Sequence, residues 1–162
     1  MNEHANAVRL TGPVRIVGTG LLGASIGLRL SSLGIDVILD DVSPSSVGLA
    51  ADLGAGRPGT PDDAPALVVV AVPPDVTADV VEAELSRFPD AVVTDVASVK
   101  LAPLNALRGR GVNLVNYIGS HPLAGRERGG AISAGGDLFV GRPWVVCRDD
   151  ETPAWALALV ED

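Results

Sequence analysis

Three glycines near the start of the chain have the spacing of a dinucleotide-binding site. The segment Gly18-Thr19-Gly20-Leu21-Leu22-Gly23 is a G-x-G-x-x-G motif between a β-branched run and a segment with helical spacing. In that context the first glycine allows a tight turn, the second lets the backbone approach a pyrophosphate, and the third allows close packing of helix on strand. The sequence predicts that Gly18, Gly20, Leu21, Leu22 and Gly23 hold the phosphates at a helix N-terminus.

Two carboxylates follow this motif at the distance expected of a ribose ligand. Asp40 and Asp41 end the next β-branched run, about 20 residues after the glycines, where an acidic residue accepts hydrogen bonds from the ribose hydroxyls of NAD. We expect Asp41 to have this role; the alternative is that both carboxylates only cap the turn. A carboxylate repels a 2′-phosphate and no arginine follows within the turn, so the sequence predicts NAD as the cofactor rather than NADP.

Polar residues also follow later β-branched runs, at the edge where a doubly wound sheet binds its ligands. Ser98 and Lys100 lie in the segment DVASVK, and His121 lies in SHPLAG. Histidine titrates near neutral pH, so His121 past a strand end could take a proton from a substrate hydroxyl while a hydride leaves the same carbon. The alternatives are that Ser98 is a plain helix N-cap and that His121 has no catalytic role.

Other residues at the same edge are candidates for contact with cofactor or substrate. Val72 and Pro73 form the turn after the third predicted strand, and we expect them to line the cofactor site. Arg126 could bind substrate carboxylates, together with Arg128, or could only keep a glycine-rich loop solvated. We expect no metal site, because no second histidine or cysteine lies at ligand spacing. Cys147 is expected to be a small buried hydrophobe within an apolar strand.

Short β-branched runs and segments of helical spacing alternate along the chain, which predicts an α/β fold with a doubly wound, mostly parallel sheet and helices on both faces. The run LVVVAV is apolar on consecutive residues, as in a central strand covered on both sides. Strands are expected at 14–18, 36–40, 67–72, 91–96, 112–118 and 142–147, and helices at 21–33, 44–53, 75–88 and 99–107. Thr152 is expected to cap a last helix that begins at Pro153.

Composition excludes several classes of protein. The chain of 162 residues has a net charge of −8, with 47% hydrophobic and 20% charged residues, which argues against nucleic-acid and membrane-surface binding. The sequence predicts a cytoplasmic protein, because it has one cysteine, no leader-like segment and no apolar run near the roughly 18 residues of a bilayer span. Residues 1–12 are expected to be a flexible tail, 13–150 the dinucleotide-binding domain, and 151–162 the start of a helix that leads to an absent C-terminal helical domain.

The segments GTGLLGASIGLRL, AVPP, TDVASVK and SHPLAGRERGGAISAGGDLF together resemble the nucleotide-binding half of the prephenate dehydrogenase family, from about Val14 to Cys147. The resemblance implies that His121 contacts the ring hydroxyl of prephenate and that Ser98 hydrogen bonds at the same place. Ser98, Lys100, His121 and Arg126 are accordingly expected to bind the substrate. The implied reaction is the NAD-dependent oxidative decarboxylation of prephenate to 4-hydroxyphenylpyruvate, in tyrosine biosynthesis.

Two departures from the family pattern bear on this expectation. Gly129 stands where family members often have a serine, and the sequence stops before the helical domain that forms the family's dimer and completes its substrate site. We therefore expect a homodimer only if that domain is present. The alternatives are an NAD-binding module without turnover, an arogenate-specific dehydrogenase, or another Rossmann dehydrogenase such as a hydroxyacid dehydrogenase or an imine reductase.

Overall fold

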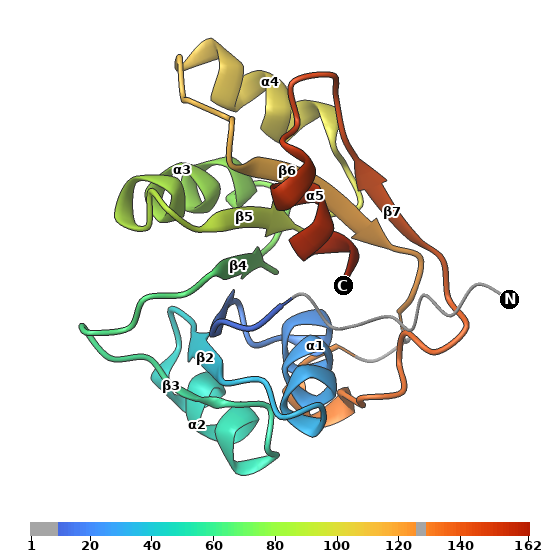
Figure 1. Ribbon diagram of the computed structural model, residues 1–162. Coiled ribbons are helices and arrows are strands. Elements are labelled where there is room, and N and C mark those ends of the chain that lie inside the picture. Colours follow the sequence, from blue (N-terminus) through green and yellow to red (C-terminus); the bar gives the residue numbers. More distant parts are fainter. Residues whose placement is uncertain (1–9, 126–128) are drawn as a thin grey trace, which may run out of the picture.

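The strands of the computed structural model, which describes residues 10–125 and 129–162, form one sheet in the order β3-β2-β1-β4-β5-β6-β7 (Figure 1). All pairings from β3 to β6 are parallel, and β7 pairs antiparallel with β6. The predicted doubly wound, mostly parallel sheet is therefore confirmed. The strands are β1 (Val14–Val17), β2 (Val37–Asp40), β3 (Arg57–Pro58), β4 (Leu67–Val70), β5 (Val92–Asp95), β6 (Tyr117–Pro122) and β7 (Trp144–Cys147).

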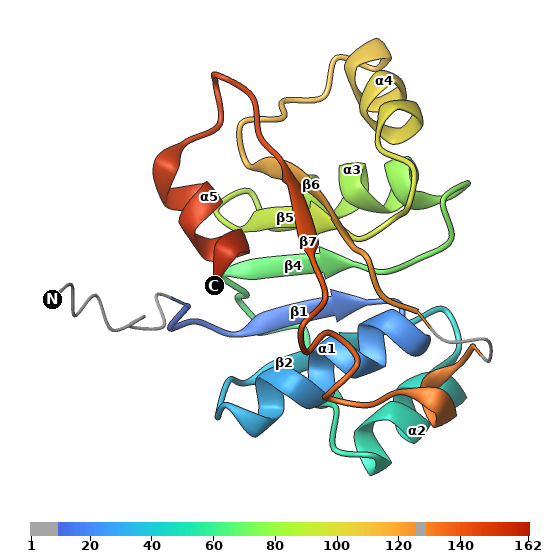
Figure 2. The ribbon, with the colours of Figure 1, turned by 90° about the vertical axis from the view of Figure 1, so that its right-hand side faces the viewer.

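Helices cover both faces of the sheet, as the alternating pattern requires. Helices α1, α2 and α5 pack on one face and α3 and α4 on the other, so α5 and the α3–α4 pair flank the sheet from opposite sides in Figure 2. The helices are α1 (Leu21–Ser32), α2 (Pro44–Asp52), α3 (Thr77–Arg87), α4 (Leu101–Gly109) and α5 (Ala154–Glu161), with a 3-10 turn η1 (Ala131–Ser133). No helix of the described ranges is long and apolar enough to cross a membrane.

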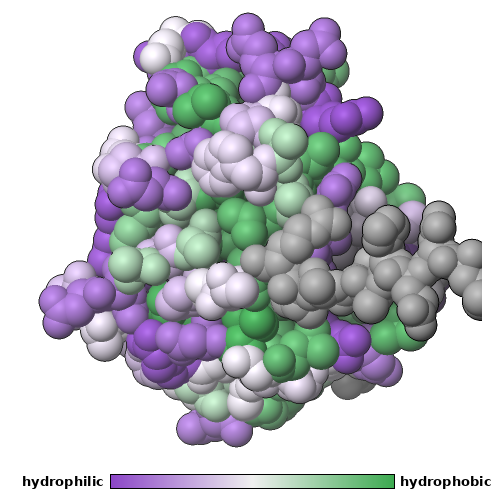
Figure 3. Space-filling model, in the orientation of Figure 1, coloured by the Kyte–Doolittle hydropathy of each residue, from purple (hydrophilic) through white to green (hydrophobic). Residues whose placement is uncertain are grey.

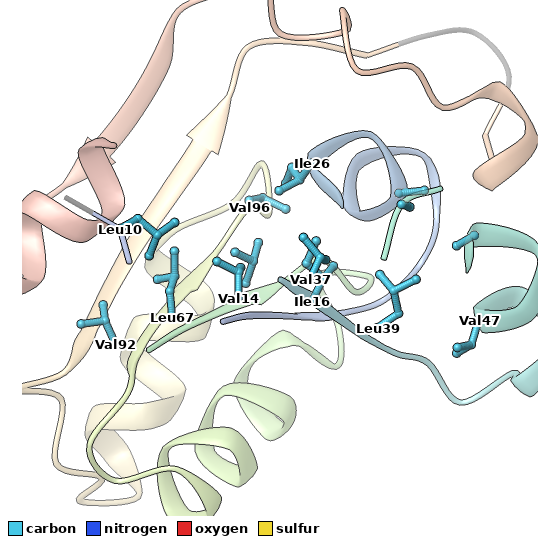
Figure 4. Close-up of a cluster of buried hydrophobic side chains, with 14 of the residues drawn as sticks. Leu10, Val14, Ile16, Ile26, Val37, Leu39, Val47, Leu67, Val92 and Val96 are labelled. Carbon is cyan, nitrogen blue, oxygen red and sulfur yellow. The ribbon is translucent and has the colours of Figure 1, made fainter. Parts of the chain in front are cut away.

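The core forms two layers because the central strand β4 is apolar on both sides. Leu67 and Val69 pack toward α1 and α5, whereas Val68 and Val70 pack toward α3 and α4. Figure 4 shows the first layer, in which side chains of β1, β2 and β4 lie together with Ile26 of α1. Burial of both faces of β4 explains why its run is apolar on consecutive residues.

Two elements near the site have boundaries that differ from the sequence expectation. The strand expected at 112–118 starts at Tyr117, because the Asn113 side chain accepts the Val115 N–H at 3.1 Å and closes a turn there. The strand then continues to Pro122, because β7 pairs along its other edge. The helix expected from residue 99 starts at Leu101.

Expectations for the two ends of the chain also need correction. Leu10 is 4% exposed and lies in the core, where its N–H donates to the Asp162 carboxylate at 2.8 Å, so the solvated tail does not extend to residue 12. Residues 1–9 lie outside the described part. Pro153 is the N-cap of α5 rather than its first residue, and the Thr152 hydroxyl bonds the Asp149 N–H instead of capping the helix.

The strand β7 is more exposed than its apolar sequence indicates. It is an edge strand, with Trp144 38% and Val145 45% exposed, and apolar side chains gather over β7 and α5 in Figure 3. Cys147 is exposed as well, so the prediction that it is a buried hydrophobe is wrong. The reason is that strand composition indicates a strand but does not say whether a second layer covers it.

Candidate functional site

The glycine motif forms the turn from β1 into α1. Gly18 has a φ of 97°, and a Cβ there would lie 2.3 Å from the Ala71 carbonyl oxygen, so only glycine fits. A Cβ on Gly23 would lie 1.9 Å from the Gly18 carbonyl oxygen, which shows how closely α1 approaches the strand end. Around Gly20, the N-cap of α1, no described atom lies within 4 Å of such a Cβ. The turn therefore leaves free space at the N-terminus of α1, where the backbone N–H groups of its first turn attract an anion.

Asp41 lies beside this turn, whereas Asp40 does not. The Asp41 Oδ2 atom accepts from the Thr19 N–H at 2.7 Å and from the Thr19 hydroxyl at 3.1 Å, and Oδ1 accepts from the Ser43 N–H at 2.9 Å. The Asp40 carboxylate instead pairs with the buried Arg15 guanidinium at 2.6 Å. Of the two carboxylates that the sequence offered, only Asp41 is held at the glycine turn.

The loop after β4 closes the other side of the turn. A Cβ on Gly18 would lie 3.2 Å from Val72 Cγ1, so Val72 packs against the first glycine of the motif. Pro73 is exposed in the same loop, before α3 begins at Thr77. β1 and β4 are neighbours whose chains leave to opposite sides of the sheet, which is the switch point where such folds bind ligands.

The sequence predicted that His121 lies past a strand end. In the structure it lies within β6. Asp95, the last residue of β5, pairs with Gly119, so His121 stands two residues farther toward the carboxyl edge, opposite Val145 of β7. Its Nδ1 atom is buried, and it is the buried side-chain polar atom for which the described residues provide no hydrogen-bond partner. His121 therefore stands at the carboxyl edge of the sheet with one of its ring nitrogens buried.

Ser98 is exposed in the loop that follows β5, at the same edge as His121. The N-cap of α4 is Lys100, so Ser98 is not the N-cap that the alternative interpretation required. Its hydroxyl is free of a capping role and is accessible to a ligand. The structure therefore brings the Ser98 loop and His121 to neighbouring strand ends, β5 and β6.

Lys100 points into the protein instead of toward the edge. Its ammonium pairs with the Asp95 carboxylate and donates to the Ser120 carbonyl oxygen at 2.6 Å. The side chain is 20% exposed, and burial lowers the pKa of Lys100, an effect that the hydrogen bond and charge of Asp95 oppose. These contacts therefore do not favour a substrate-binding role for Lys100.

Two further expectations of the sequence analysis concern Arg126 and a metal site. Arg126 lies outside the described residues. Within the described ranges, no group of three or more His, Cys, Asp and Glu side chains could hold a metal ion.

Three polar residues around Lys100 were missed by the sequence reasoning: Asp95, Tyr117 and Ser120. Asp95 is fully buried, Tyr117 donates its hydroxyl to Asp95 Oδ2 at 2.6 Å, and the Ser120 hydroxyl donates to the Asp95 carbonyl at 3.0 Å. The available signal was a carboxylate at the end of an apolar run, followed five residues later by the one lysine of the chain.

Comparison with known proteins agrees with this geometry. Residues 26–162 match a family model described as the nucleotide-binding domain of prephenate dehydrogenase. A protein described as a probable prephenate dehydrogenase from Streptomyces niveus is 42% identical over 142 residues, which are 88% of this chain and 39% of that protein. Cyclohexadienyl dehydrogenase from Zymomonas mobilis is 31% identical over 159 residues, 92% of this chain and 53% of that protein.

A solved structure extends the similarity to three dimensions. Prephenate dehydrogenase from Aquifex aeolicus, in complex with hydroxyphenyl propionate and NAD+, superposes with a TM-score of 0.79 at 28% identity. The match covers 92% of this chain and 55% of that structure. The chain thus spans about half, or less, of the length of each of these relatives.

Proposed function

Because the chain belongs to the prephenate dehydrogenase family, as its nucleotide-binding domain, we propose that it binds NAD and carries the base for the oxidation of prephenate. One observation carries the proposal: the glycine turn with Asp41 and the strand end with His121 lie at the same carboxyl edge of one sheet. A cofactor held at the first and a substrate held at the second would meet over β4 and β5.

The residues present fit NAD. The open N-terminus of α1 suits the pyrophosphate, since Gly20 leaves room for it and the helix dipole favours negative charge. Among the described residues, Asp41 Oδ1 accepts a hydrogen bond from the Ser43 N–H, so it keeps capacity to accept a second one from a ribose hydroxyl. Val72 and Pro73 would line the side of the cofactor opposite Asp41.

In the proposed reaction, His121 Nε2 accepts the proton of the ring hydroxyl, and the Ser98 hydroxyl hydrogen bonds beside it. NAD, when bound, accepts the hydride that leaves the same ring carbon, while the ring carboxylate departs as carbon dioxide and the ring becomes aromatic. The chain therefore needs to supply only a base, a hydrogen bond and correct positioning. His121 then returns the proton to the phenolate oxygen, so the product is 4-hydroxyphenylpyruvate.

The proposal predicts a clear cofactor preference that depends on Asp41. Asp41→Asn keeps the size of the side chain but removes the charge that repels a 2′-phosphate and weakens the bond to the ribose. We expect NAD affinity to fall about tenfold, in line with about 1.5 kcal/mol for a hydrogen bond to a charged group, and NADP affinity to rise. Isothermal titration with both cofactors measures the change, and Asp40→Asn is the matched control. An unchanged NAD-to-NADP ratio in Asp41→Asn would remove Asp41 from the ribose site.

Turnover tests the proposed reaction. The chain at high concentration is mixed with NAD and prephenate, with arogenate or NADP in parallel wells, and the absorbance of NADH is followed. We expect NADH to form in the well that contains prephenate and NAD. NADH only with arogenate would reassign the substrate, and no NADH in any well would make this chain a nucleotide-binding module without turnover of its own.

A further inference from the structure

A cluster of buried polar side chains ties the end of β5 to β6 just before His121. Asp95 is its centre: Oδ1 accepts from the Lys100 ammonium and from the Ala97 N–H at 2.9 Å, and Oδ2 accepts the Tyr117 hydroxyl at 2.6 Å. Lys100 also bonds the Ser120 carbonyl at 2.6 Å. One ammonium therefore links the last residue of β5, the loop that carries Ser98, and the residue that precedes His121.

Gly119 makes room for this cluster. A Cβ at this position would lie 3.3 Å from Lys100 Cδ, 3.3 Å from the Tyr117 hydroxyl oxygen and 3.4 Å from Asp95 Oδ2. The three side chains thus close over the glycine on the face of β6 that also bears His121, since side chains two residues apart point to the same side of a strand.

We propose that Lys100 and Tyr117 are positioning residues, which fix His121 and the Ser98 loop relative to each other through Asp95. The inference rests on the proposed function only in naming His121 as the base. Neither residue acts on substrate: Tyr117 is bonded to Asp95, and Lys100 directs its ammonium at Asp95 and Ser120. Loss of either donor leaves a buried carboxylate short of a partner, so the loop or strand must move.

Burial acts in opposite directions on the two donors of the cluster. Burial raises the pKa of Tyr117, and the adjacent Asp95 raises it further, so the phenol stays protonated and continues to donate. Asp95 likewise opposes the lowering of the Lys100 pKa by burial. The Tyr117 hydroxyl is therefore a donor to Asp95 throughout the pH range in which a histidine base works.

The test observes the His121 ring directly, because the chain has only two histidines. In protein labelled with 15N-histidine and carrying His4→Gln, the imidazole resonances belong to His121 alone. We expect Tyr117→Phe and Lys100→Met each to shift these resonances and to weaken the nuclear Overhauser contacts between the ring and Val145. The control Arg108→Met also removes a positive charge, from the exposed side of α4, and should leave the resonances unchanged.

Kinetics separate positioning from substrate binding. Both variants should lower kcat for NADH formation about 10- to 100-fold with little change in KM, because a small misplacement of a catalytic group has effects of this size. Unshifted His121 resonances in folded Tyr117→Phe would overturn the inference, whether or not Lys100→Met folds. A raised KM in Lys100→Met alone, with Tyr117→Phe like the wild type, would make Lys100 a substrate ligand instead. Shifted resonances without any NADH formation would count against the proposed reaction and not against the positioning role.

Discussion

Replacing His121 with asparagine should lower the rate of NADH formation from prephenate by about 10²- to 10⁴-fold, the usual contribution of a general base. Asparagine keeps a polar group at the position of Nδ1 but cannot accept a proton near neutral pH. NAD affinity should stay at the wild-type value, because His121 lies on β6 and the glycine turn follows β1. Stopped-flow or steady-state absorbance of NADH gives the rate, and calorimetry gives the affinity.

The burial of Nδ1 makes this variant informative. Nδ1 is buried, and the asparagine amide nitrogen can still fill that inner position, whereas the variant has no counterpart of Nε2, the base in the proposed reaction. Ser98→Ala provides the comparison, since it removes a hydrogen bond and not a base, and should cost less than His121→Asn. Wild-type turnover in His121→Asn would exclude His121 from the mechanism.

Gly23→Ala should produce the second large effect, on folding and cofactor binding together. The new Cβ would lie 1.9 Å from the Gly18 carbonyl oxygen, which is backbone and cannot rotate away. The helix must therefore move off the strand end, at a cost of about 3 kcal/mol in the free energy of unfolding, and NAD binding should fall below detection. Chemical denaturation and calorimetric titration measure the two losses.

Gly20→Ala is the matched control for this prediction, because its Cβ would enter open space among the described residues. We expect its free energy of unfolding to change little, while NAD affinity falls about tenfold or more because the methyl group occupies the path of the pyrophosphate. Equal stability of Gly23→Ala and wild type would show that α1 can shift without cost, contrary to the geometry.

Local patterns predicted the parts of the fold that depend on local rules. The glycine motif and the consecutive apolar residues of β4 each have one structural solution, and each is found. The wrong predictions concern which elements pack over a given residue in the tertiary structure. Cys147 is exposed because β7 is an edge strand, and Leu10 is buried because α5, far away in the sequence, packs beside it.

The candidate site also has features that local sequence indicates and features that depend on tertiary structure. Asp41 and His121 could be chosen as candidates because a ligand site at strand ends leaves a sequence signature. The inward direction of Lys100 could not, since it depends on the register of β5 against β6, which brings Asp95 level with Gly119 and Ser120 next to it. A lysine near a predicted helix start indicates a charge but not where that charge points.

Titration of the wild-type protein with NAD tests whether this chain holds NAD at the glycine turn. We expect one site per chain with micromolar affinity, at least tenfold weaker binding of NADP, and loss of the signal in Gly23→Ala. No heat of binding up to millimolar NAD, or equal affinity for NAD and NADP, would contradict this expectation.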